Sequence, residues 1–322
     1  MKEGNNMLRK ITSLIVILAL ALLPAAFAEE AAVRVGALKG PTAMGMVEMM
    51  EDHADTYDFT LAAAPDEIVP LLVKGELDIA AVPANLGSVL YNNTQGAVKA
   101  LAINTLGVLY ICERGESISS VADLKGRTLV SAGKGSTPEY ALNYILRGNG
   151  LDPEKDLTIE YKSEHAECLA AMLQDETLVA MLPQPFATVA MGKADDLRPA
   201  LDLTEAWDAL QADEENPSTL ITGIAVARAD FIEQHPEAVK QFMDDYRESV
   251  IFAQQNVADA AQLIGKFDIF EAGPAEKALP YCNITFIDGE DLKTKLSGYL
   301  DVLFEADPAS VGGAVPGEDF YY

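Results

Sequence analysis

The sequence predicts an α/β fold made of two similar lobes, and three observations support that prediction. Short strand patterns alternate with helix patterns along most of the 322 residues, which is typical of a mainly parallel sheet covered by helices. The turns at 37–42 and 132–137 both read A-x-K-G-x-T, and each leads from a strand pattern into a helix pattern. A second matching pair of turns, at 80–85 and 180–185, follows at a similar distance. Two such pairs indicate one α/β unit used twice.

The first unit contains three strand patterns, each followed by a helix pattern. Apolar residues at helical spacing, Met44, Val47 and Met50, mark the first helix. Thr42 is suited to be its N-cap, because a hydroxyl can accept a free backbone N–H, and Gly75 ends the second helix as a C-cap residue does. The expected elements are strands 33–38, 57–62 and 77–82 and helices 42–50, 65–74 and 85–91.

The second unit repeats this order between two similar apolar strands. Its expected strands are 128–130, 157–161 and 178–182, and its helices are 138–147, 164–174 and 184–192. The runs 104–110 and 220–227 each combine an apolar strand with a glycine, so we expect the chain to cross between the lobes there. The domain prediction is lobe 1 at 29–112, lobe 2 at 113–222, and lobe 1 again, with the C-terminal helices, at 223–322.

The N-terminal segment, 1–28, has the pattern of a secretory signal peptide. Arg9 and Lys10 precede an apolar run at 11–23, and Ala26-Phe27-Ala28 forms an A-x-A cleavage site. The run is shorter than the about 20 residues that a membrane-spanning helix needs, although an N-terminal anchor is the alternative reading. No cysteine for lipid attachment stands near the cleavage site, and either Met1 or Met7 can be the start. We expect an exported, soluble protein at the periplasmic or extracellular face of the membrane.

The formal net charge of -27 limits the classes of partner. Nucleic acids and anionic membrane surfaces would be repelled by it. An anionic small ligand remains compatible, because local backbone dipoles can outweigh a distant mean field. The three cysteines, Cys112, Cys168 and Cys282, allow one disulfide but show no disulfide framework, and Cys112 has the setting of a buried apolar residue.

Motifs for catalysis and for metal binding are missing from the sequence. The three histidines lie far apart and none has the helical spacing of metal ligands. There is no G-x-S-x-G elbow. The run 134–137 is superficially similar to a phosphate-binding loop, but its lysine precedes the last glycine instead of following it. The sequence therefore predicts no catalytic residue, no metal and no cofactor.

The strand-to-helix turns offer binding chemistry instead. Hydroxyls and free N–H groups at helix starts can hold carboxylate, sulfonate, phosphate or polar ring edges. Side-chain amides both donate and accept hydrogen bonds, and Met44, Tyr140 and Phe186 supply apolar or stacking surface. The alternative is that the threonines only cap helices and the prolines only end strands. Lys39 and Lys134 fit a ligand contact and an exposed position equally well.

Four segments resemble the substrate-binding proteins of bacterial ABC importers, in the SsuA/THI5-like (NMT1-like) group that includes nitrate, sulfonate, taurine and thiamine-pyrimidine binders. The segments are 75–80, 123–130, 135–140 and 182–185. The resemblance implies a type II periplasmic-binding-protein fold, two α/β lobes joined by two crossing strands. It also implies a ligand held between the lobes, hinge closure and delivery to a membrane permease. Many exported binding proteins carry a lipid-attachment cysteine near the cleavage site, and this sequence differs from them because it has none there.

The residues and the resemblance together give one set of expected ligand-binding positions. The resemblance places contacts near Thr42, Asn85, Thr105, Ser136, Thr137, Gln184 and Thr222. The turns and their apolar neighbours complete the predicted set, which is Gly40, Thr42, Met44, Asn85, Thr105, Gly135, Ser136, Thr137, Tyr140, Gln184 and Thr222.

Three functions are consistent with these observations. The first is a monomeric solute-binding protein of an ABC importer, without catalysis. The second is an enzyme of pyrimidine or menaquinone precursor synthesis, some of which are similar in fold, and the third is a ligand-binding sensor domain. The predicted turns contain no arginine, which favours a heterocycle or an organic monoanion, such as a pyrimidine or a sulfonate, over a doubly charged oxyanion.

Overall fold

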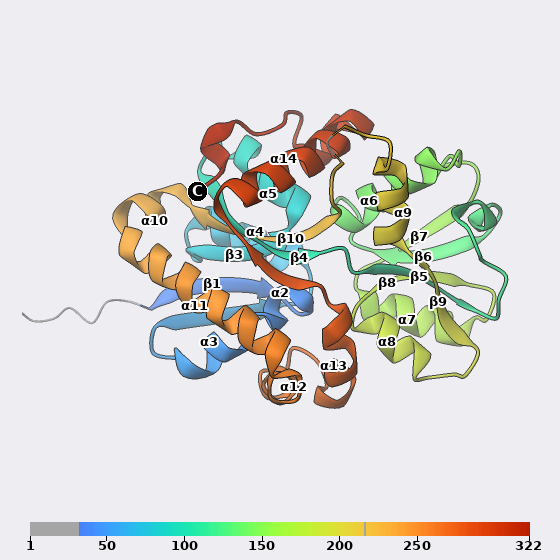
Figure 1. The fold of residues 1–322 in the computed structure, drawn as a ribbon, viewed down its shortest axis with the longest axis horizontal. Coiled ribbons are helices and arrows are strands. Elements are labelled where there is room, and N and C mark those ends of the chain that lie inside the picture. Colours follow the sequence, from blue (N-terminus) through green and yellow to red (C-terminus); the bar gives the residue numbers. More distant parts are fainter. Residues whose placement is uncertain (1–31, 216) are drawn as a thin grey trace, which may run out of the picture. The chain divides into compact units, whose positions relative to one another are not determined.

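The computed structural model describes residues 32–215 and 217–322, and the predicted signal peptide lies outside these ranges. Residues from Val33 to Tyr322 form one compact unit that contains two β-sheets (Figure 1). The predicted α/β class with two lobes is confirmed by these sheets and the helices that cover them.

The larger sheet has six strands in the order β11-β4-β10-β3-β1-β2. Strand β1 pairs in parallel with β2 and β3, whereas β10 pairs antiparallel with β3 and β4. The strands are β1 Val33–Leu38, β2 Tyr57–Ala62, β3 Ile79–Pro83, β4 Val98–Leu106, β10 Ile221–Arg228 and β11 Ile284–Ile287. The helices connecting the first of them are α2 Pro41–Met44, α3 Val47–Asp52, α4 Pro65–Lys74 and α5 Ala84–Asn93.

The smaller sheet has five strands in the order β7-β6-β8-β5-β9, which repeats the larger sheet's pattern. Strand β6 pairs in parallel with β7 and β8, as β1 does with β2 and β3, and β5 pairs antiparallel with β8 and β9. The strands are β5 Leu109–Arg114, β6 Thr128–Ala132, β7 Thr158–Lys162, β8 Val179–Pro183 and β9 Leu197–Asp202. The helices are α6 Thr137–Gly148, α7 His165–Gln174, α8 Phe186–Met191 and α9 Leu203–Gln211. The same strand arrangement in both sheets agrees with one unit used twice.

The chain passes between the sheets twice. The first passage is at Gly107–Val108, between β4 and β5, and the second lies between α9 and β10. Both fall in or next to the apolar runs where crossings were predicted. Gly107 is packed so closely against α9 that a Cβ atom would overlap the Thr204 side chain. The lobe boundaries expected at residues 112 and 222 stay a prediction.

The C-terminal part is helical and returns to the larger sheet (Figure 1). The long helix α11, Pro236–Gln255, buries Val239, Phe242, Tyr246 and Val250 on one face, as its apolar spacing predicts. The remaining helices are α10 Ala229–Gln234, α11 Pro236–Gln255, α12 Val257–Lys266, α13 Ala272–Ala278 and α14 Gly289–Ala306.

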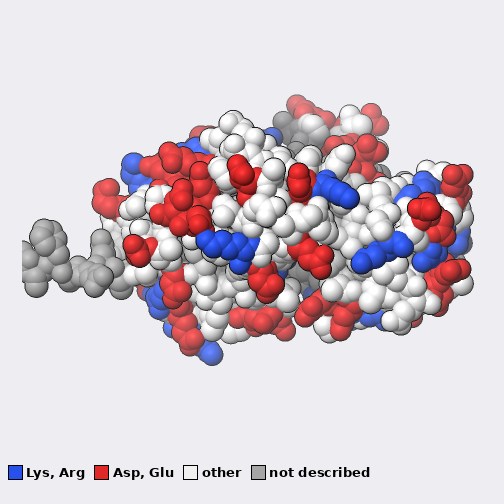
Figure 2. Space-filling model, turned by 90° about the horizontal axis from the view of Figure 1, so that it is seen from below, with Lys and Arg blue, Asp and Glu red and all other residues white. Residues whose placement is uncertain are grey.

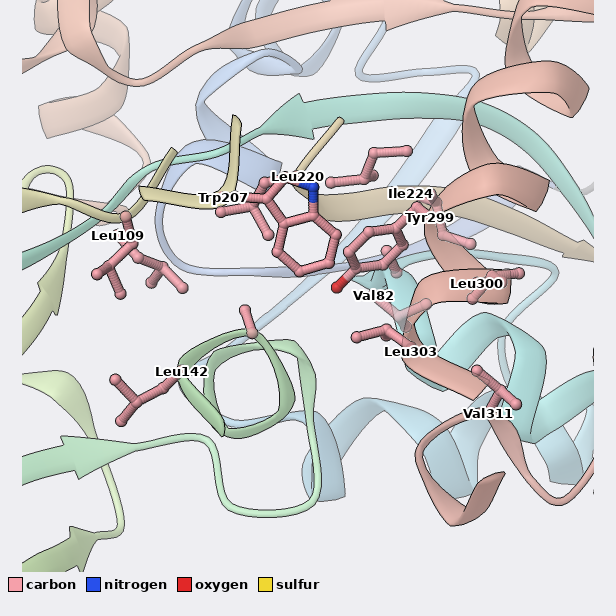
Figure 3. Close-up of a cluster of buried hydrophobic side chains, with 14 of the residues drawn as sticks. Val82, Leu109, Leu142, Trp207, Leu220, Ile224, Tyr299, Leu300, Leu303 and Val311 are labelled. Atoms are coloured by element: carbon pink, nitrogen blue, oxygen red, sulfur yellow. The ribbon is translucent and has the colours of Figure 1, made fainter. Parts of the chain in front are cut away.

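One buried apolar cluster joins the two sheets (Figure 3). Trp207 of α9 stands between Tyr299 of α14 and Tyr144 of α6, with ring centroids 5.4 Å and 4.5 Å apart. Leu142 of α6 and Ile224 of β10 belong to the same cluster. Because helices attached to both sheets share this core, burial of its apolar surface stabilises the joint between the sheets as well as each sheet.

The predicted single helix at 42–50 is wrong. The structure divides it into α2 and α3 at Gly45, where a Cβ atom would come within 2.8 Å of Ile284 and 3.2 Å of Val250. The helix therefore passes too close to its neighbours for a larger residue. The expected N-cap role of Thr42 is also wrong, because Gly40 is the N-cap and the Thr42 hydroxyl donates to the Leu38 carbonyl at 2.8 Å.

The three cysteines are free and buried, so the possible disulfide is absent from the described residues. Burial raises the pKa of the Cys112 thiol to about 12, which keeps it protonated as a small apolar side chain.

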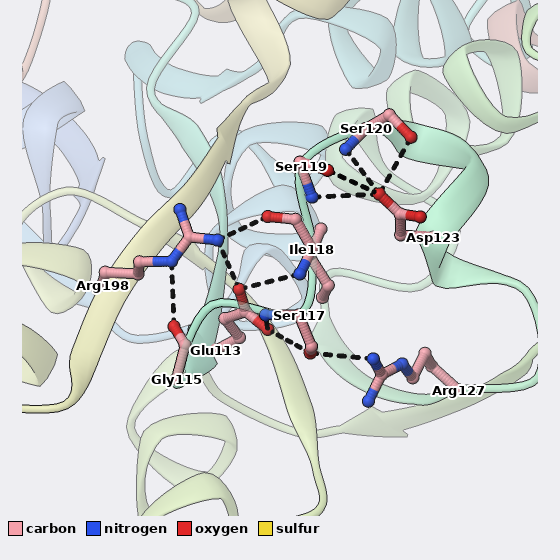
Figure 4. A network of polar contacts seen from close by, with 9 residues as sticks. All are labelled: Glu113, Gly115, Ser117, Ile118, Ser119, Ser120, Asp123, Arg127 and Arg198. Atoms are coloured by element: carbon pink, nitrogen blue, oxygen red, sulfur yellow. Dashed lines mark hydrogen bonds and ion pairs between the residues drawn. The ribbon is translucent and has the colours of Figure 1, made fainter.

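A polar network fixes the segment that follows β5 (Figure 4). The Glu113 carboxylate is buried and accepts hydrogen bonds from the Ser117 hydroxyl at 2.6 Å, the Ile118 N–H at 3.0 Å and Arg198 at 2.6 Å. Burial raises the pKa of Glu113, but donation from Ser117, Ile118 and Arg198 outweighs it, so the pKa lies below its usual value. Because the charge is fully hydrogen-bonded, β5 and β9 are tied together where they leave the sheet.

Acidic residues outnumber basic ones in this chain, 50 to 23. Figure 2 shows a face on which Asp and Glu outweigh Lys and Arg, in agreement with the net charge of -27. Within the described ranges, no helix combines the length and the apolar character needed to span a membrane.

Candidate functional site

A cavity of about 130 Å³ lies between the two sheets. The last residues of four matching strands line it: Leu38 of β1, Pro83 of β3, Ala132 of β6 and Pro183 of β8. Ligands of open α/β sheets bind outside the carboxyl ends of the strands, so this is where the fold is expected to hold one.

Six of the predicted binding residues line this cavity. They are Gly40, Thr42, Thr105, Ser136, Gln184 and Thr222. Thr42, Thr105 and Thr222 come from the larger sheet and its first turn, whereas Ser136 and Gln184 come from the smaller sheet. The turns after β1, β6 and β8 therefore meet across one space, as predicted from their sequence similarity.

The polar groups of these residues are partly engaged with the backbone. The Ser136 hydroxyl donates to the Gly133 carbonyl at 2.8 Å and the Thr222 hydroxyl donates to the Leu106 carbonyl at 2.5 Å. Their oxygens keep lone pairs for a donor group of a ligand. The Gln184 Oε1 accepts from the Thr188 N–H and hydroxyl, which fixes the side chain.

The other five predicted residues do not line the cavity. Met44 is fully buried in the core beneath the larger sheet, and Tyr140 packs against the core that joins the sheets. Gly135 lies in the exposed part of its turn, with φ of 73° and its N–H donating to Glu139 at 2.5 Å. Asn85 and Thr137 are fully buried against each other.

Among the lining residues outside the predicted set, three with polar side chains follow β7. They are Ser163, Glu164 and His165, and the corresponding turn after β2 contributes Ala63, Ala64 and Pro65. These third turns were not among the predicted binding turns, which are two in each unit. The signal was available, because each is also a strand pattern followed by a helix pattern.

His165 contributes an aromatic ring with polar nitrogen atoms to the lining of the cavity. Its Nδ1 atom is buried and has no hydrogen-bond partner in the protein, and its ring centroid lies 6.0 Å from that of Phe186, which also lines the cavity. Burial lowers the pKa of His165 to about 4, although part of the residue faces the cavity. The imidazole is therefore neutral near pH 7 and can donate or accept a hydrogen bond.

The turn between α12 and α13 reaches both walls of the cavity. Asp268 forms an ion pair with Lys39 at 2.9 Å. Phe270 meets the Phe186 ring edge-on, with centroids 5.2 Å apart. Lys39 lines the cavity from the larger sheet and Phe186 from the smaller one, so this turn connects the two walls.

No group of three or more His, Cys, Asp or Glu side chains converges on a metal-sized site in the described ranges.

A family model for the periplasmic substrate-binding proteins of phosphonate ABC transporters matches residues 45–272. A comparison with curated proteins gives no significant match. Among solved structures, an ABC transporter protein from Parabacteroides distasonis aligns with a TM-score of 0.75 and 23% identity, covering 91% of this chain and 99% of that one.

Two further structures show the same fold. The periplasmic aliphatic sulphonate-binding protein SsuA from Escherichia coli aligns with a TM-score of 0.70 and 17% identity, over 90% of this chain and 92% of that one. The nitrate-binding protein NrtA from Synechocystis aligns with a TM-score of 0.64 and 15% identity, over 87% and 84%. These similarities confirm the periplasmic-binding-protein fold and agree with the SsuA-like resemblance. On the match to its family model, the chain belongs to the periplasmic substrate-binding proteins of ABC transporters.

Proposed function

We propose that this protein is the extracytoplasmic solute-binding component of an ABC importer, which captures a small organic solute in the cavity between its sheets and delivers it to a permease. The observation that carries the proposal is the cavity itself, whose walls come from the matching turns of both sheets. A ligand there contacts both walls at once and so favours the conformation in which they are close.

Export to the periplasm or to the outer face of the membrane belongs to this proposal. The family is periplasmic by description, and the N-terminal segment has the signal-peptide pattern. We expect no nucleic acid among its partners, because the net charge of -27 repels the phosphate backbone. A monomer suffices, because one chain supplies both walls of the cavity.

The proposed ligand is a heterocycle or an organic monoanion, such as a pyrimidine or a sulfonate. The lining combines apolar side chains with hydroxyls and the Gln184 amide, and the Phe186 and His165 rings offer a surface on which a ring can pack. Among the described residues that line the cavity there is no arginine to pair with a doubly charged group.

We further propose that the protein catalyses no reaction. Nucleophilic catalysis needs a nucleophile within hydrogen-bond reach of a base. Of the five lining hydroxyls, those of Thr42, Ser136 and Thr222 donate to backbone carbonyls and that of Thr105 donates to the Asn104 amide, whereas no hydrogen bond joins the Ser163 hydroxyl to His165. Turnover of a bound compound would favour the enzyme alternative, and binding without any effect on uptake would favour the sensor.

The test begins with native mass spectrometry of protein purified without refolding, followed by thermal shifts against pyrimidines, sulfonates and nitrate. A ligand at 100 times its dissociation constant should add about 2.7 kcal/mol to the free energy of unfolding. Ser163→Phe should abolish the shift, because an added ring fills the cavity from an exposed position. Thr60→Phe, at an exposed position of β2 outside the lining, is the control and should retain the shift.

Uptake by cells separates transport from binding alone. Deletion of the protein should abolish high-affinity uptake of the identified solute, and the wild-type protein, but not Ser163→Phe, should restore it. Restoration by Ser163→Phe would contradict the cavity as the binding site.

A further inference from the structure

We propose that Phe270 closes the cavity from the larger sheet, and that its contact with Phe186 is the one that breaks when the two sheets move apart. The solute then enters and leaves between α8 and the α12–α13 turn, residues 267–271. This inference rests on the proposed function and deepens it, because it names the side on which the cavity opens and a residue that sets the rate of release. Phe270 acts through Phe186 and is therefore a positioning residue.

On one side of the cavity, the two sheets share a single core. Helices α5 and α14 of the larger sheet pack there against α6 of the smaller one (Figure 1), and their buried apolar residues belong to one cluster. The buried contact of Asn85 with Thr137 lies between two of these helices. Separating the sheets on this side would expose core surface to water, so this side holds together when the cavity opens.

On the other side, each sheet has a core of its own. Helices α3, α11, α12 and α13 bury one apolar cluster against the larger sheet, whereas α7 and α8 bury another against the smaller one. Helices α13 and α8 are neighbours there (Figure 1). Because no buried cluster of the described residues spans this side, the sheets can part here without opening a core.

The rings of Phe186 and Phe270 meet where these two separate cores face each other. Phe186 packs against the core of the smaller sheet and Phe270 against that of the larger one, and both are only partly buried. Their ring centroids lie 5.2 Å apart at an interplanar angle of 87°, the edge-to-face arrangement that aromatic pairs favour. Since both rings are already partly exposed, separating them costs far less than separating the shared core.

The turn that carries Phe270 is fixed to the larger sheet. The Ile269 N–H donates to the Ile264 carbonyl at 3.1 Å, and the Ile269 side chain is buried in the core of that sheet. Asp268 pairs with Lys39 at 2.9 Å, but this pair is largely exposed and adds little. Phe270 therefore moves with the larger sheet, whereas Phe186 moves with the smaller one.

Phe186 connects this contact to the solute. It is the first residue of α8 and lines the cavity, whereas Phe270 is not among the lining residues. The His165 ring, from the same sheet as Phe186, has its centroid 6.0 Å from that of Phe186. One ring from each sheet thus holds Phe186 in the cavity wall. A solute that contacts both walls favours the closed arrangement, and the contact of Phe270 in turn delays its escape.

Spin labels measure the opening without any solute. Lys193→Cys, just after α8, and Lys277→Cys, in α13, place one exposed label on each side of the contact, and the native cysteines are buried. Pulsed electron resonance gives the distribution of distances between the labels. Phe270→Ala should reduce the ratio of the short to the long distance population about two- to tenfold, the range expected for one lost aromatic contact. An unchanged distribution would overturn the inference.

Two control variants and a second pair of labels separate closing from general loosening. Phe270→Tyr keeps the ring and should keep the wild-type distribution. Phe286→Ala removes an edge-on contact with Tyr246, at 5.5 Å, that lies within the core of the larger sheet, and should not open the cavity. Labels at Ala209→Cys in α9 and Lys295→Cys in α14, across the shared core, should keep their distance in Phe270→Ala. Equal opening in Phe286→Ala, or at both label pairs, would contradict the inference.

Release of the solute is the functional readout. For the solute identified by native mass spectrometry, Phe270→Ala should raise the dissociation rate constant about two- to tenfold in surface plasmon resonance, while the association rate constant stays equal or rises. A change confined to the association rate constant would contradict the role of Phe270.

Folding and binding are checked separately. If Phe270→Ala does not fold by circular dichroism, Phe270→Leu, which keeps an apolar side chain but removes the ring, replaces it with the same expectations. If no solute binds, the proposed function fails, and the label distances still decide whether Phe270 closes the cavity.

Discussion

Thr137, which follows a strand of the smaller sheet, and Asn85, which follows a strand of the larger sheet, form hydrogen bonds with each other. The Thr137 hydroxyl donates to Asn85 Oδ1 at 3.2 Å and accepts the Asn85 N–H at 3.4 Å, and neither residue is exposed to solvent. The Asn85 Nδ2 donates to the Ser310 carbonyl at 2.9 Å. Both residues were predicted to contact the ligand, and the structure instead places them in a contact between α5 and α6.

Thr137→Val should therefore destabilise the protein. It keeps the side-chain shape but leaves the buried Asn85 groups without their partner, at a cost of about 1–3 kcal/mol. Urea unfolding monitored by circular dichroism measures the change. Thr158→Val, at an exposed position of β7, should stay within about 0.5 kcal/mol of the wild-type protein. Equal stability of the two variants would show that the Thr137 contact contributes nothing.

The close packing of Gly107 against Thr204 predicts that the effects of mutations at these two positions on stability are coupled. Gly107→Ala should cost about 1–3 kcal/mol, because the added methyl group overlaps Thr204. Thr204→Ala removes the overlapping atoms, so the double variant should recover part of the loss. A double-mutant cycle by urea unfolding should give a coupling free energy above about 0.5 kcal/mol. Additive effects would mean that the backbone moves to accommodate the methyl group.

The Glu113 network predicts a loss of stability at neutral pH. Glu113→Gln replaces a buried carboxylate that holds Arg198 and the Ser117–Ile118 turn, and should cost about 2 kcal/mol at pH 7. The pKa of Glu113 is lowered in the folded protein, so its contribution is present above the unfolded pKa and disappears as pH falls through the folded one. The difference between variant and wild type should thus shrink in acid.

Glu160→Gln is the control for that experiment. Glu160 pairs with Lys162 at the surface at 3.1 Å, and an exposed pair contributes about 0–1 kcal/mol. A loss in Glu160→Gln as large as in Glu113→Gln would contradict the special role of the buried network.

His165 should also make the stability of the protein depend on pH, but because it is buried in its uncharged form, whereas Glu113 is buried as the charged carboxylate. Its pKa is about 4 when folded and about 6.5 when unfolded, so the unfolded chain binds the proton more tightly. Stability is unaffected above pH 6.5 and falls as the pH drops from 6.5 towards 4. Between pH 7 and pH 4.5 the wild-type protein should lose at most about 3 kcal/mol relative to His165→Gln. Parallel pH profiles of the two proteins would show that the ring is not protected from solvent.

The fold followed from the sequence because it depends on periodic patterns within each element. Strand and helix alternation, the repeated turns and the glycine-containing crossings are all local signals, and the two sheets carry them in the same order. The prediction of a single helix at 42–50 was wrong; the break lies at Gly45, which packs against Ile284 and Val250, residues far away in sequence.

The lining residues that the sequence predicts lie in the turns after strands or, like Thr105 and Thr222, near the ends of the crossing strands. Thr42, Ser136 and Gln184 stand directly after strands and line the cavity, whereas Met44 and Tyr140 lie deeper in their helices, where side chains turn to the core. The contact between Asn85 and Thr137 depends on how the two sheets pack, which no local pattern contains. That the lining residues bind a ligand stays a prediction, which the thermal shifts of the wild-type protein and of Ser163→Phe test.

Trp207 gives the protein its own optical reporter. It is the only tryptophan among the 322 residues, and it stands where helices of both sheets share one core. Its indole N–H donates to the Ser218 hydroxyl at 3.0 Å, and two tyrosine rings flank it. Movement of one sheet against the other changes the polarity and the energy-transfer partners of this fluorophore. Emission from unlabelled protein can therefore follow the joint in real time, during binding as well as during unfolding.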